Sequence, residues 1–210
     1  MFEKDRLEMV DKQIIARGVA HNGIIEAMRR IPRHLFVPEE HRRDAYADHP
    51  VHIGHGQTIS QPYIVACMLE LSEPGPSKRL LEIGSGSGYL VAVAASLFKE
   101  VVGIERIEEL CTASRAALQA TGVTNAHIIC ADGYEGEEGA RFDSIIVSCS
   151  CSRPPPPLLE QLSPGGVFVA PVGDVIFQEL VVVRRSLQGD LSTEIHGGVR
   201  FVPLISPHEA

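Results

Sequence analysis

The stretch Leu80-Leu81-Glu82-Ile83-Gly84-Ser85-Gly86-Ser87-Gly88-Tyr89 decides the fold of this chain. A short apolar run, predicted to be a strand, leads directly into a glycine-rich turn, and a helix is predicted to follow. Glycines permit a tight turn and let a ligand approach the backbone, while the N-terminus of the next helix offers unpaired N–H groups. The stretch therefore predicts a ligand-binding turn between a strand and a helix of an α/β sheet.

Downstream of this turn, short apolar runs alternate with helical stretches. Strands are predicted over residues 79–83, 101–104, 126–130 and 144–147, and helices over residues 88–97 and 108–120. Apolar strands separated by helices are typical of a parallel sheet that is covered on both faces. Three further strands, over residues 166–171, 179–184 and 199–204, are linked by turns. We therefore expect a Rossmann-like, mostly parallel sheet that ends in a C-terminal antiparallel edge.

The first 50 residues indicate short helices. Leu7, Val10 and Ile14 recur at helical spacing before Gly18, and a second apolar stripe ends at Pro32. Residues 52–58 are rich in Gly and His without periodicity, which predicts a loop. A helix is predicted to begin near residue 60 and to run to residue 72.

The composition excludes several classes of protein. The chain has 210 residues, 44% of them hydrophobic, which permits a sizeable core. Its formal net charge is -8, with Lys and Arg scattered, so we expect no nucleic-acid partner. We find no Cys-x-x-Cys pair, no signal-peptide pattern and no apolar run of about 18 residues. These features predict a reduced, cytoplasmic protein with no membrane partner and no metal.

Acidic residues near the glycine turn discriminate between two ligands. Glu105 lies about 20 positions beyond the turn. An acidic residue at this spacing in nucleotide-binding sheets accepts hydrogen bonds from ribose hydroxyls. A dinucleotide turn needs glycine at its sixth place, which here is Tyr89. Glu82 suits a ligand that carries an ammonium group, as the methionine end of S-adenosylmethionine does. The pattern favours S-adenosylmethionine over NAD.

Asp132 follows the third predicted strand of the sheet. Ligands of open parallel sheets bind outside the carboxyl ends of the strands, so Asp132 is placed to accept a hydrogen bond from an adenine amine. An Asp-Gly turn formed with Gly133 is the alternative interpretation.

The segment Gly54-His55-Gly56-Gln57-Thr58-Ile59-Ser60-Gln61-Pro62-Tyr63 closely resembles the active-site segment of protein-L-isoaspartate O-methyltransferases. Segments that resemble the same family follow in the same order over almost the whole chain: residues 31–38, 81–89, 133–136, 158–166, 171–173 and 200–204. With the element pattern, the resemblance implies a class I methyltransferase fold. We expect one domain over residues 1–210, with an N-terminal helical substrate-site region (1–75), an adenosylmethionine-binding core (76–150) and C-terminal strands (151–210).

The resemblance also implies an activity, which is methyl transfer from S-adenosylmethionine to the α-carboxylate of L-isoaspartyl residues in damaged proteins. The ester then decays through a succinimide, and the cofactor product is S-adenosylhomocysteine. The expected cofactor residues are Glu82, Gly84, Ser85, Gly86, Gly88, Glu105, Arg106, Asp132 and Gly133. Ser60 matches the active-site serine, and Thr58, Ile59, Gln61 and Val202 are expected at the peptide site. The implied partners are isoaspartyl proteins and peptides, with the enzyme a monomer.

This reaction needs alignment more than acid–base chemistry. A carboxylate with a pKa of about 3.5 is already a nucleophile at neutral pH, so no strong base is required. We expect Ser60 to orient it by a hydrogen bond. The alternative interpretation is that Ser60 caps the helix that begins near Pro62. At residues 148–153 this chain has Ser-Cys-Ser-Cys-Ser-Arg, where the family usually has alanines and an acidic residue before a proline. This departure concerns which substrates the protein accepts.

Three other functions remain open at this point. A class I methyltransferase that acts on another carboxylate, a small molecule or a nucleic acid is the first alternative. An NAD-dependent oxidoreductase is the second, and a nucleotide-binding module without catalysis is the third.

Overall fold

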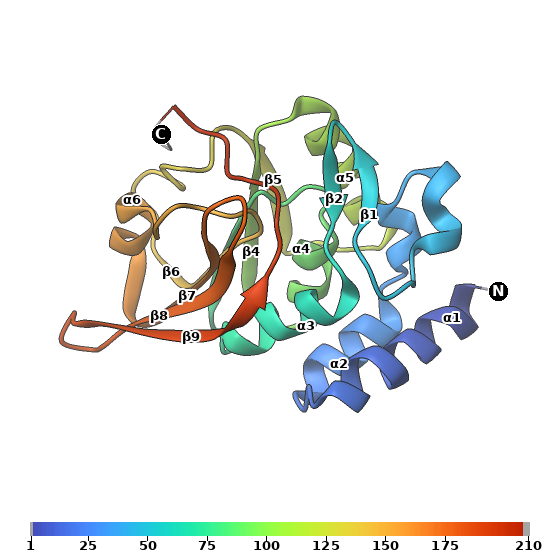
Figure 1. The fold of residues 1–210 in the computed structure, drawn as a ribbon, viewed down its shortest axis with the longest axis horizontal. Coiled ribbons are helices and arrows are strands. Elements are labelled where there is room, and N and C mark those ends of the chain that lie inside the picture. The colour runs from blue at the N-terminus through green and yellow to red at the C-terminus, as the bar shows by residue number, and fades with distance from the viewer. Residues whose placement is uncertain (1, 208–210) are drawn as a thin grey trace.

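A computed structural model describes residues 2–207 and contains a large twisted sheet with helices packed against it (Figure 1). Within those residues the sheet has seven strands in the order β5-β4-β3-β6-β7-β8-β9. Their bounds are β3 (Arg79–Ile83), β4 (Glu100–Glu105), β5 (Ala126–Cys130), β6 (Phe142–Val147), β7 (Leu162–Gly173), β8 (Gln178–Arg185) and β9 (Leu191–Val199). Neighbouring strands from β5 to β7 run parallel, and β8 and β9 add antiparallel pairs. The predicted fold class is confirmed.

The chain reverses its direction of travel across the sheet between β3 and β6. β3 pairs with β4 on one side and with β6 on the other, although β6 comes later in the chain. At such a switch point the connections leave in opposite directions, which opens a crevice at the carboxyl ends of the strands. The glycine turn follows β3 and therefore lies at this crevice.

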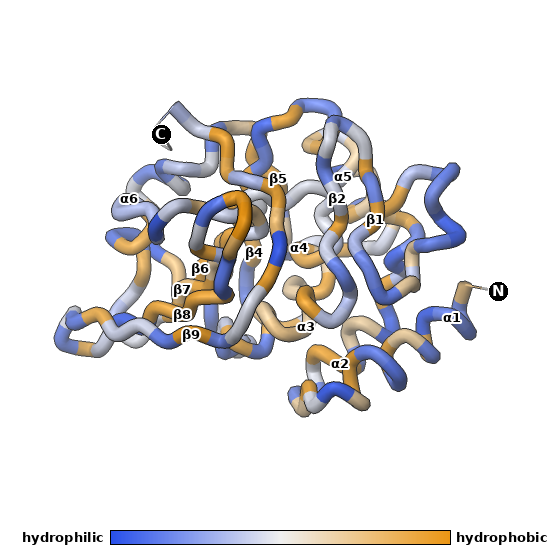
Figure 2. The backbone as a smooth tube through the Cα atoms, in the orientation of Figure 1, coloured by the Kyte–Doolittle hydropathy of each residue, from blue (hydrophilic) through white to orange (hydrophobic). Residues whose placement is uncertain are grey.

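Helices cover the sheet on both faces and explain its continuous apolar runs. They are α3 (Pro62–Leu71), α4 (Tyr89–Ala94), α5 (Glu108–Ala120) and α6 (Pro156–Glu160). One core cluster joins the N-terminal helices, α3, α4 and α5 to the sheet, and a second lies on the opposite face with Leu158 of α6. Figure 2 shows the hydrophobic residues gathered along the inner strands, whereas α1 is largely hydrophilic. Burial on both faces is the reason these strands lack alternation.

The N-terminal region is a series of short helices, as predicted. They are α1 (Phe2–Met9), η1 (Val10–Ile14), η2 (Ile15–Arg17), α2 (Asn22–Arg30), η3 (Arg33–Phe36) and η4 (Glu39–Asp44). The apolar stripe predicted at its start is buried at Val10 and Ile14, but Leu7 is exposed. The region ends in a hairpin that packs beside the main sheet (Figure 1).

That hairpin corrects the loop predicted over residues 52–58. β1 (Val51–Gly54) and β2 (Gln57–Ile59) pair antiparallel. The turn between them places Gly54, His55 and Gly56 at φ of 91°, 52° and 71°. Because the strands are this short and three residues of the segment belong to the left-handed turn, few residues remain on each side. An alternation of apolar and polar residues is therefore not visible in the sequence.

The last strand was also predicted in the wrong place. The edge strand is β9, whereas residues 200–204 form no strand and are joined to the sheet region by an isolated bridge between Ser150 and Pro203. β9 is exposed along almost its whole length, so its sequence carries no apolar pattern. The apolar residues after it line a cavity instead. Helix α6 is not predicted from the sequence, because a run of prolines usually indicates a turn. Proline is nevertheless tolerated at the first helical position, where α6 begins.

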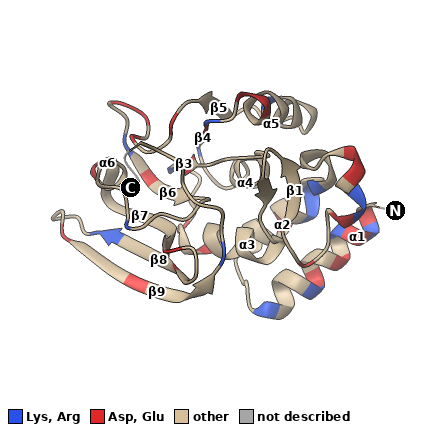
Figure 3. Cartoon of the chain, turned by 45° about the horizontal axis from the view of Figure 1, so that its top comes forward, with Lys and Arg blue, Asp and Glu red and all other residues tan. Residues whose placement is uncertain are grey.

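Among residues 2–207, no helix combines the length and the apolarity that crossing a bilayer requires. Figure 3 shows basic and acidic residues interspersed on the N-terminal helices, and ion pairs such as Arg29 with Asp11 connect them. The arginines of that region therefore form no uninterrupted basic track.

Candidate functional site

The glycine turn between β3 and α4 is built from left-handed residues. Gly84, Gly86 and Gly88 have φ of 71°, 51° and 79°, a region that residues with side chains rarely adopt. A Cβ atom on Gly84 would lie 3.2 Å from Cys149 Sγ, and one on Gly88 would lie 2.9 Å from Ser114 Cβ. Gly84 and Gly86 border a cavity, whereas Gly88 lets α4 pack closely on α5. The three glycines share one sequence motif, but only two of them border the cavity.

The Glu105 carboxylate fixes the shape of this turn. Glu105 ends β4 and is 6% exposed. Its Oε2 accepts a hydrogen bond from the Gly86 N–H (3.0 Å), and its Oε1 accepts from the N–H groups of Arg106 (2.8 Å) and Ile107 (2.9 Å). A carboxylate has about four acceptor sites, so capacity remains for a ligand hydroxyl. One charged group thus holds the turn against β4 and faces the cavity.

Glu82 is a buried carboxyl with an unused oxygen. Its side chain lies on β3 and is 2% exposed, and its Oε1 accepts a hydrogen bond from Ser148 Oγ (2.6 Å). Burial raises the pKa of Glu82 to about 8, against the hydrogen bond from Ser148, which lowers it. Its Oε2 has no hydrogen-bond partner among the described residues, and neither has the buried Oγ of Ser85. Buried polar atoms are seldom left unpaired, so this pair is arranged to meet a polar ligand.

Three neighbouring cavities, which share Thr58 and Ser148 in their linings, surround these residues. The main cavity lies at the carboxyl ends of β3 and β4, beside the glycine turn. Its lining includes the predicted residues Thr58, Gly84, Gly86, Glu105, Arg106, Gly133 and Val202. The inner cavity lies behind the turn and includes Thr58, Ile59, Ser60, Glu82, Gly84, Ser85 and Gly86. The outer cavity includes Thr58, Ser60, Gln61 and Val202 with Pro50, Ile64, Ser148, Arg200 and Phe201.

Ser60 lies where the inner and outer cavities meet. The capping interpretation of Ser60 is wrong, because α3 has Gln61 at its N-cap, without a side-chain capping bond, and Pro62 at its first position. No hydrogen bond joins the Ser60 hydroxyl to another described residue. This hydroxyl is therefore available to a ligand in either cavity.

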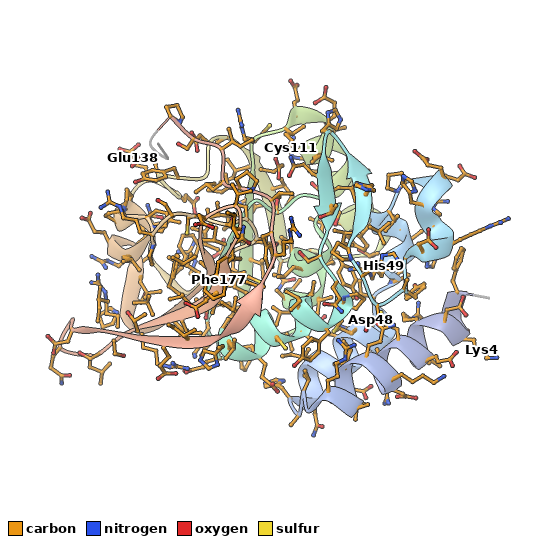
Figure 4. The ribbon with its side chains drawn as sticks, in the orientation of Figure 1. Lys4, Asp48, His49, Cys111, Glu138 and Phe177 are labelled. Carbon is orange, nitrogen blue, oxygen red and sulfur yellow. The ribbon has the colours of Figure 1, made fainter. Side chains whose placement is uncertain are left out.

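Two predicted residues make contacts with the protein itself. Asp132 Oδ1 accepts from the Tyr134 N–H (3.0 Å), and Oδ2 accepts from Ser206 Oγ (2.9 Å). Asp132 thus forms the turn that was its alternative interpretation, and it lines none of the three cavities. The Gln61 amide donates to Asp48 Oδ1 (2.8 Å) and to the Asp48 carbonyl (3.1 Å), while Gln61 still borders the outer cavity. Asp48 is labelled in Figure 4, in the segment before β1.

Sequence reasoning assigned no role to two further residues at the site. Ser148, at the end of β6, borders all three cavities and holds Glu82. Its signal was the departure of residues 148–153 from the family pattern. Arg33 is buried and donates to the Ser60 carbonyl. It stands in a segment of family resemblance, but nothing in the spacing connects it with Ser60.

The arrangement fits S-adenosylmethionine. The unpaired Glu82 Oε2 suits an ammonium group, Glu105 suits ribose hydroxyls, and the glycine backbone permits close approach of the ligand. Within the described part of the chain, no group of three or more His, Cys, Asp or Glu residues is arranged to hold a metal ion. Ser60 and Thr58 reach from the inner to the outer cavity, so a second molecule in the outer cavity would meet the ligand there.

Comparison with known proteins agrees with this geometry. The sequence model described as protein-L-isoaspartate(D-aspartate) O-methyltransferase matches residues 4–209. A protein-L-isoaspartate O-methyltransferase of Pelotomaculum thermopropionicum is 47% identical over 202 residues, which cover 96% of this chain and 88% of the relative. One of Methanospirillum hungatei is also 47% identical, over 96% of this chain and 93% of its own length.

A solved structure is similar over the same extent. The protein-L-isoaspartate O-methyltransferase of Plasmodium falciparum, in complex with S-adenosyl-L-homocysteine, has a TM-score of 0.83 and 25% identity. The similarity covers 95% of this chain and 98% of that one. The similarity therefore extends over nearly the whole of both chains.

Proposed function

The chain belongs to the protein-L-isoaspartate(D-aspartate) O-methyltransferase family, and we propose that its three cavities carry out that family's reaction. The protein is an S-adenosylmethionine-dependent protein carboxyl methyltransferase. It transfers a methyl group to the α-carboxyl of L-isoaspartyl residues in damaged proteins. The observation that carries the proposal is that Ser60 borders both the inner and the outer cavity, so it lies between a cofactor-type site and a second space for an acceptor.

The reaction requires the protein to align the reacting groups. Bound S-adenosylmethionine supplies a methyl group on a positively charged sulfur, which is a good leaving group. The substrate carboxylate is ionised at neutral pH, so no residue has to remove a proton from it. One carbon–oxygen bond forms as one carbon–sulfur bond breaks. Holding the oxygen, carbon and sulfur in line can be worth about 7–11 kcal/mol, and that is the task of the residues described here.

We assign the cofactor contacts from the cavity linings. Glu82 Oε2 accepts from the ammonium group of the methionine end, beside Ser85 and the backbone of Gly84 and Gly86. Glu105 accepts from the ribose hydroxyls, with Arg106 next to it. Gly133 borders the adenine end of the main cavity. Gly88 contributes through helix packing. The hydrogen bond from the adenine amine to Asp132 stays a prediction, since Asp132 lines none of the three cavities.

The outer cavity is the proposed peptide site. Ser60 donates its hydroxyl hydrogen to one carboxylate oxygen and leaves the other oxygen free to attack. Thr58, Ile59, Gln61 and Val202 line the approach of the peptide. Arg200, which also borders this cavity, adds a positive charge for an acidic group. The role of Ser60 is supported by its available hydroxyl between the two cavities. The roles of the other residues are supported only by their positions in the cavity lining.

The test of the proposal is labelled methyl transfer to an isoaspartyl peptide and to its aspartyl twin. The two differ in the position of one methylene, so selectivity has to arise from placement of the carboxylate. We expect a base-labile methyl ester on the isoaspartyl peptide alone. Equal labelling of both peptides, or label that survives mild base, would contradict the proposal and favour a methyltransferase with another acceptor.

The remaining assignments are also proposals. We infer that the enzyme acts as a monomer in the cytoplasm on isoaspartyl proteins and peptides and not on nucleic acid, as the charge of -8 favours. We further infer one functional domain over residues 1–210, in which residues 1–75 supply most of the peptide site and residues 76–150 the cofactor core. Size-exclusion chromatography with light scattering measures the oligomeric state.

A further inference from the structure

Arg33 is a fully buried arginine on the core side of Ser60. It is the first residue of η3, its exposed fraction is 0%, and it lines none of the three cavities. Arginine is rarely buried in this way unless it is paired, because removing a charge from water is costly. Its contacts therefore require an explanation.

Those contacts join three segments of the chain. Nε donates to the Ala45 carbonyl and Nη2 donates to the Ser60 carbonyl, each at 2.7 Å. The guanidinium carbon lies 4.9 Å from the ring centroid of Tyr89, over its face. Tyr89 is the first residue of α4, directly after the glycine turn. Arg33 thus connects the residue that faces the acceptor with the helix that follows the cofactor turn.

The positive charge of Arg33 has no acidic partner in the part of the chain that the structure describes. Within residues 2–207 no Asp or Glu forms an ion pair with it, and its Nη1 has no hydrogen-bond partner. Burial lowers the pKa of Arg33 to about 10, so the group stays charged at neutral pH. Carbonyl oxygens and the ring of Tyr89 stabilise the charge only in part. Ser60 contacts this charge through its carbonyl and also borders the outer cavity.

We propose that Arg33 is a positioning residue for methyl transfer, and that its buried charge favours an anionic acceptor at Ser60. Its two hydrogen bonds hold the Ser60 segment at a set distance from α4, and hence from the donor site. Its charge makes the Ser60 region more favourable for a carboxylate than for a neutral group of the same shape. The inference rests on the proposed function, because it needs a carboxylate acceptor in the outer cavity.

The first experiment compares Arg33→Met and Arg33→Lys with the wild type. Arg185→Met is the matched control, because Arg185 on β8 also donates to a backbone carbonyl, that of Leu159 (2.9 Å), and also has a buried Nε without a partner. We expect Arg33→Met to lower kcat/KM for an isoaspartyl peptide by about 100-fold, the cost of a displacement near 1 Å. S-adenosylhomocysteine affinity, measured by calorimetry, should change by less than about threefold. Lysine restores the charge but not the planar guanidinium with its two hydrogen bonds. The kcat/KM of Arg33→Lys should therefore be about tenfold higher than that of Arg33→Met.

The second experiment isolates the charge. With S-adenosylhomocysteine bound, binding of the isoaspartyl peptide is compared with binding of its twin that carries an α-carboxamide. The wild type and Arg33→Lys should prefer the carboxylate, and Arg33→Met should lose about tenfold of that preference. A merely structural arginine would leave the ratio unchanged, since both peptides fill the same space.

Three results would overturn the inference. They are an unchanged preference ratio in Arg33→Met, activity of Arg33→Lys no higher than that of Arg33→Met, and a loss of S-adenosylhomocysteine affinity that parallels the loss of turnover. Failure of the proposed function has a different signature. In that case the wild type itself would neither methylate the isoaspartyl peptide nor prefer the carboxylate, and the inference on Arg33 would fail with it.

Discussion

The substitution Glu82→Gln is expected to stabilise the ligand-free protein while it weakens cofactor binding. Burial raises the pKa of Glu82 from 4.5 to about 8. The folded state therefore keeps this proton to a higher pH than the unfolded chain does. The free energy of unfolding consequently decreases as the pH rises from 4.5 to about 8, and the stability present below that range is lost above it. At about 1.4 kcal/mol per pH unit, the loss is on the order of 5 kcal/mol.

Glutamine removes this cost and keeps a carbonyl oxygen for Ser148. Melting temperatures are measured at about pH 5 and pH 8.5, and that of the wild type should fall more than that of Glu82→Gln. For a chain of this size the difference at the higher pH should approach roughly 10 °C. Saturating S-adenosylhomocysteine should remove the difference, because its ammonium group pairs with the ionised Glu82. The variant should bind this ligand about 10- to 100-fold more weakly, as expected for a lost hydrogen bond to a charged group.

A surface carboxyl provides the matched control. Glu100→Gln loses a half-exposed ion pair with Arg79 and should cost no more than about 1 kcal/mol, with no change in ligand affinity. Parallel melting curves for the wild type and Glu82→Gln across the pH range would refute the buried-acid argument. Equal S-adenosylhomocysteine affinities would refute the ammonium assignment independently.

Three further substitutions test the site. Ser60→Ala should lower kcat by about 10- to 100-fold. The melting temperature should not change, because Ser60 does not cap α3. A variant that is less stable but fully active would restore the capping interpretation. Glu105→Ala should weaken S-adenosylhomocysteine binding by about 1.5–3 kcal/mol in calorimetry, and an unchanged affinity would exclude the ribose contact. Gly88→Ala should lower stability by at least about 1–2 kcal/mol, because of its φ of 79° and the close approach to Ser114. Adding Ser114→Gly should return part of that loss, and no recovery would argue against the packing role of Gly88.

The core of the fold was predictable because its signals are local. Apolar runs between helices marked β3, β4 and β6, since strands buried on both faces need apolar residues at most positions. β5 is a partly exposed edge strand that keeps an apolar run. Predictions failed where a local signal was absent or had another cause. β9 is exposed on both faces and has no pattern, whereas residues 200–204 are apolar because they border a cavity.

The sequence by itself determined the class of ligand, the reaction and twelve of the residues that line the three cavities. Glycine spacing and the acids at the strand ends can be read in order along the chain, because parallel strands bring their carboxyl ends to one edge. Only the tertiary structure decided the roles that depend on distant partners. Asp132 is engaged by Ser206 and Glu82 by Ser148, while Arg33 reaches a carbonyl 27 positions away in the chain. Hydrogen-bond partners and burial are set by how separate segments pack, and no spacing in the sequence encodes them.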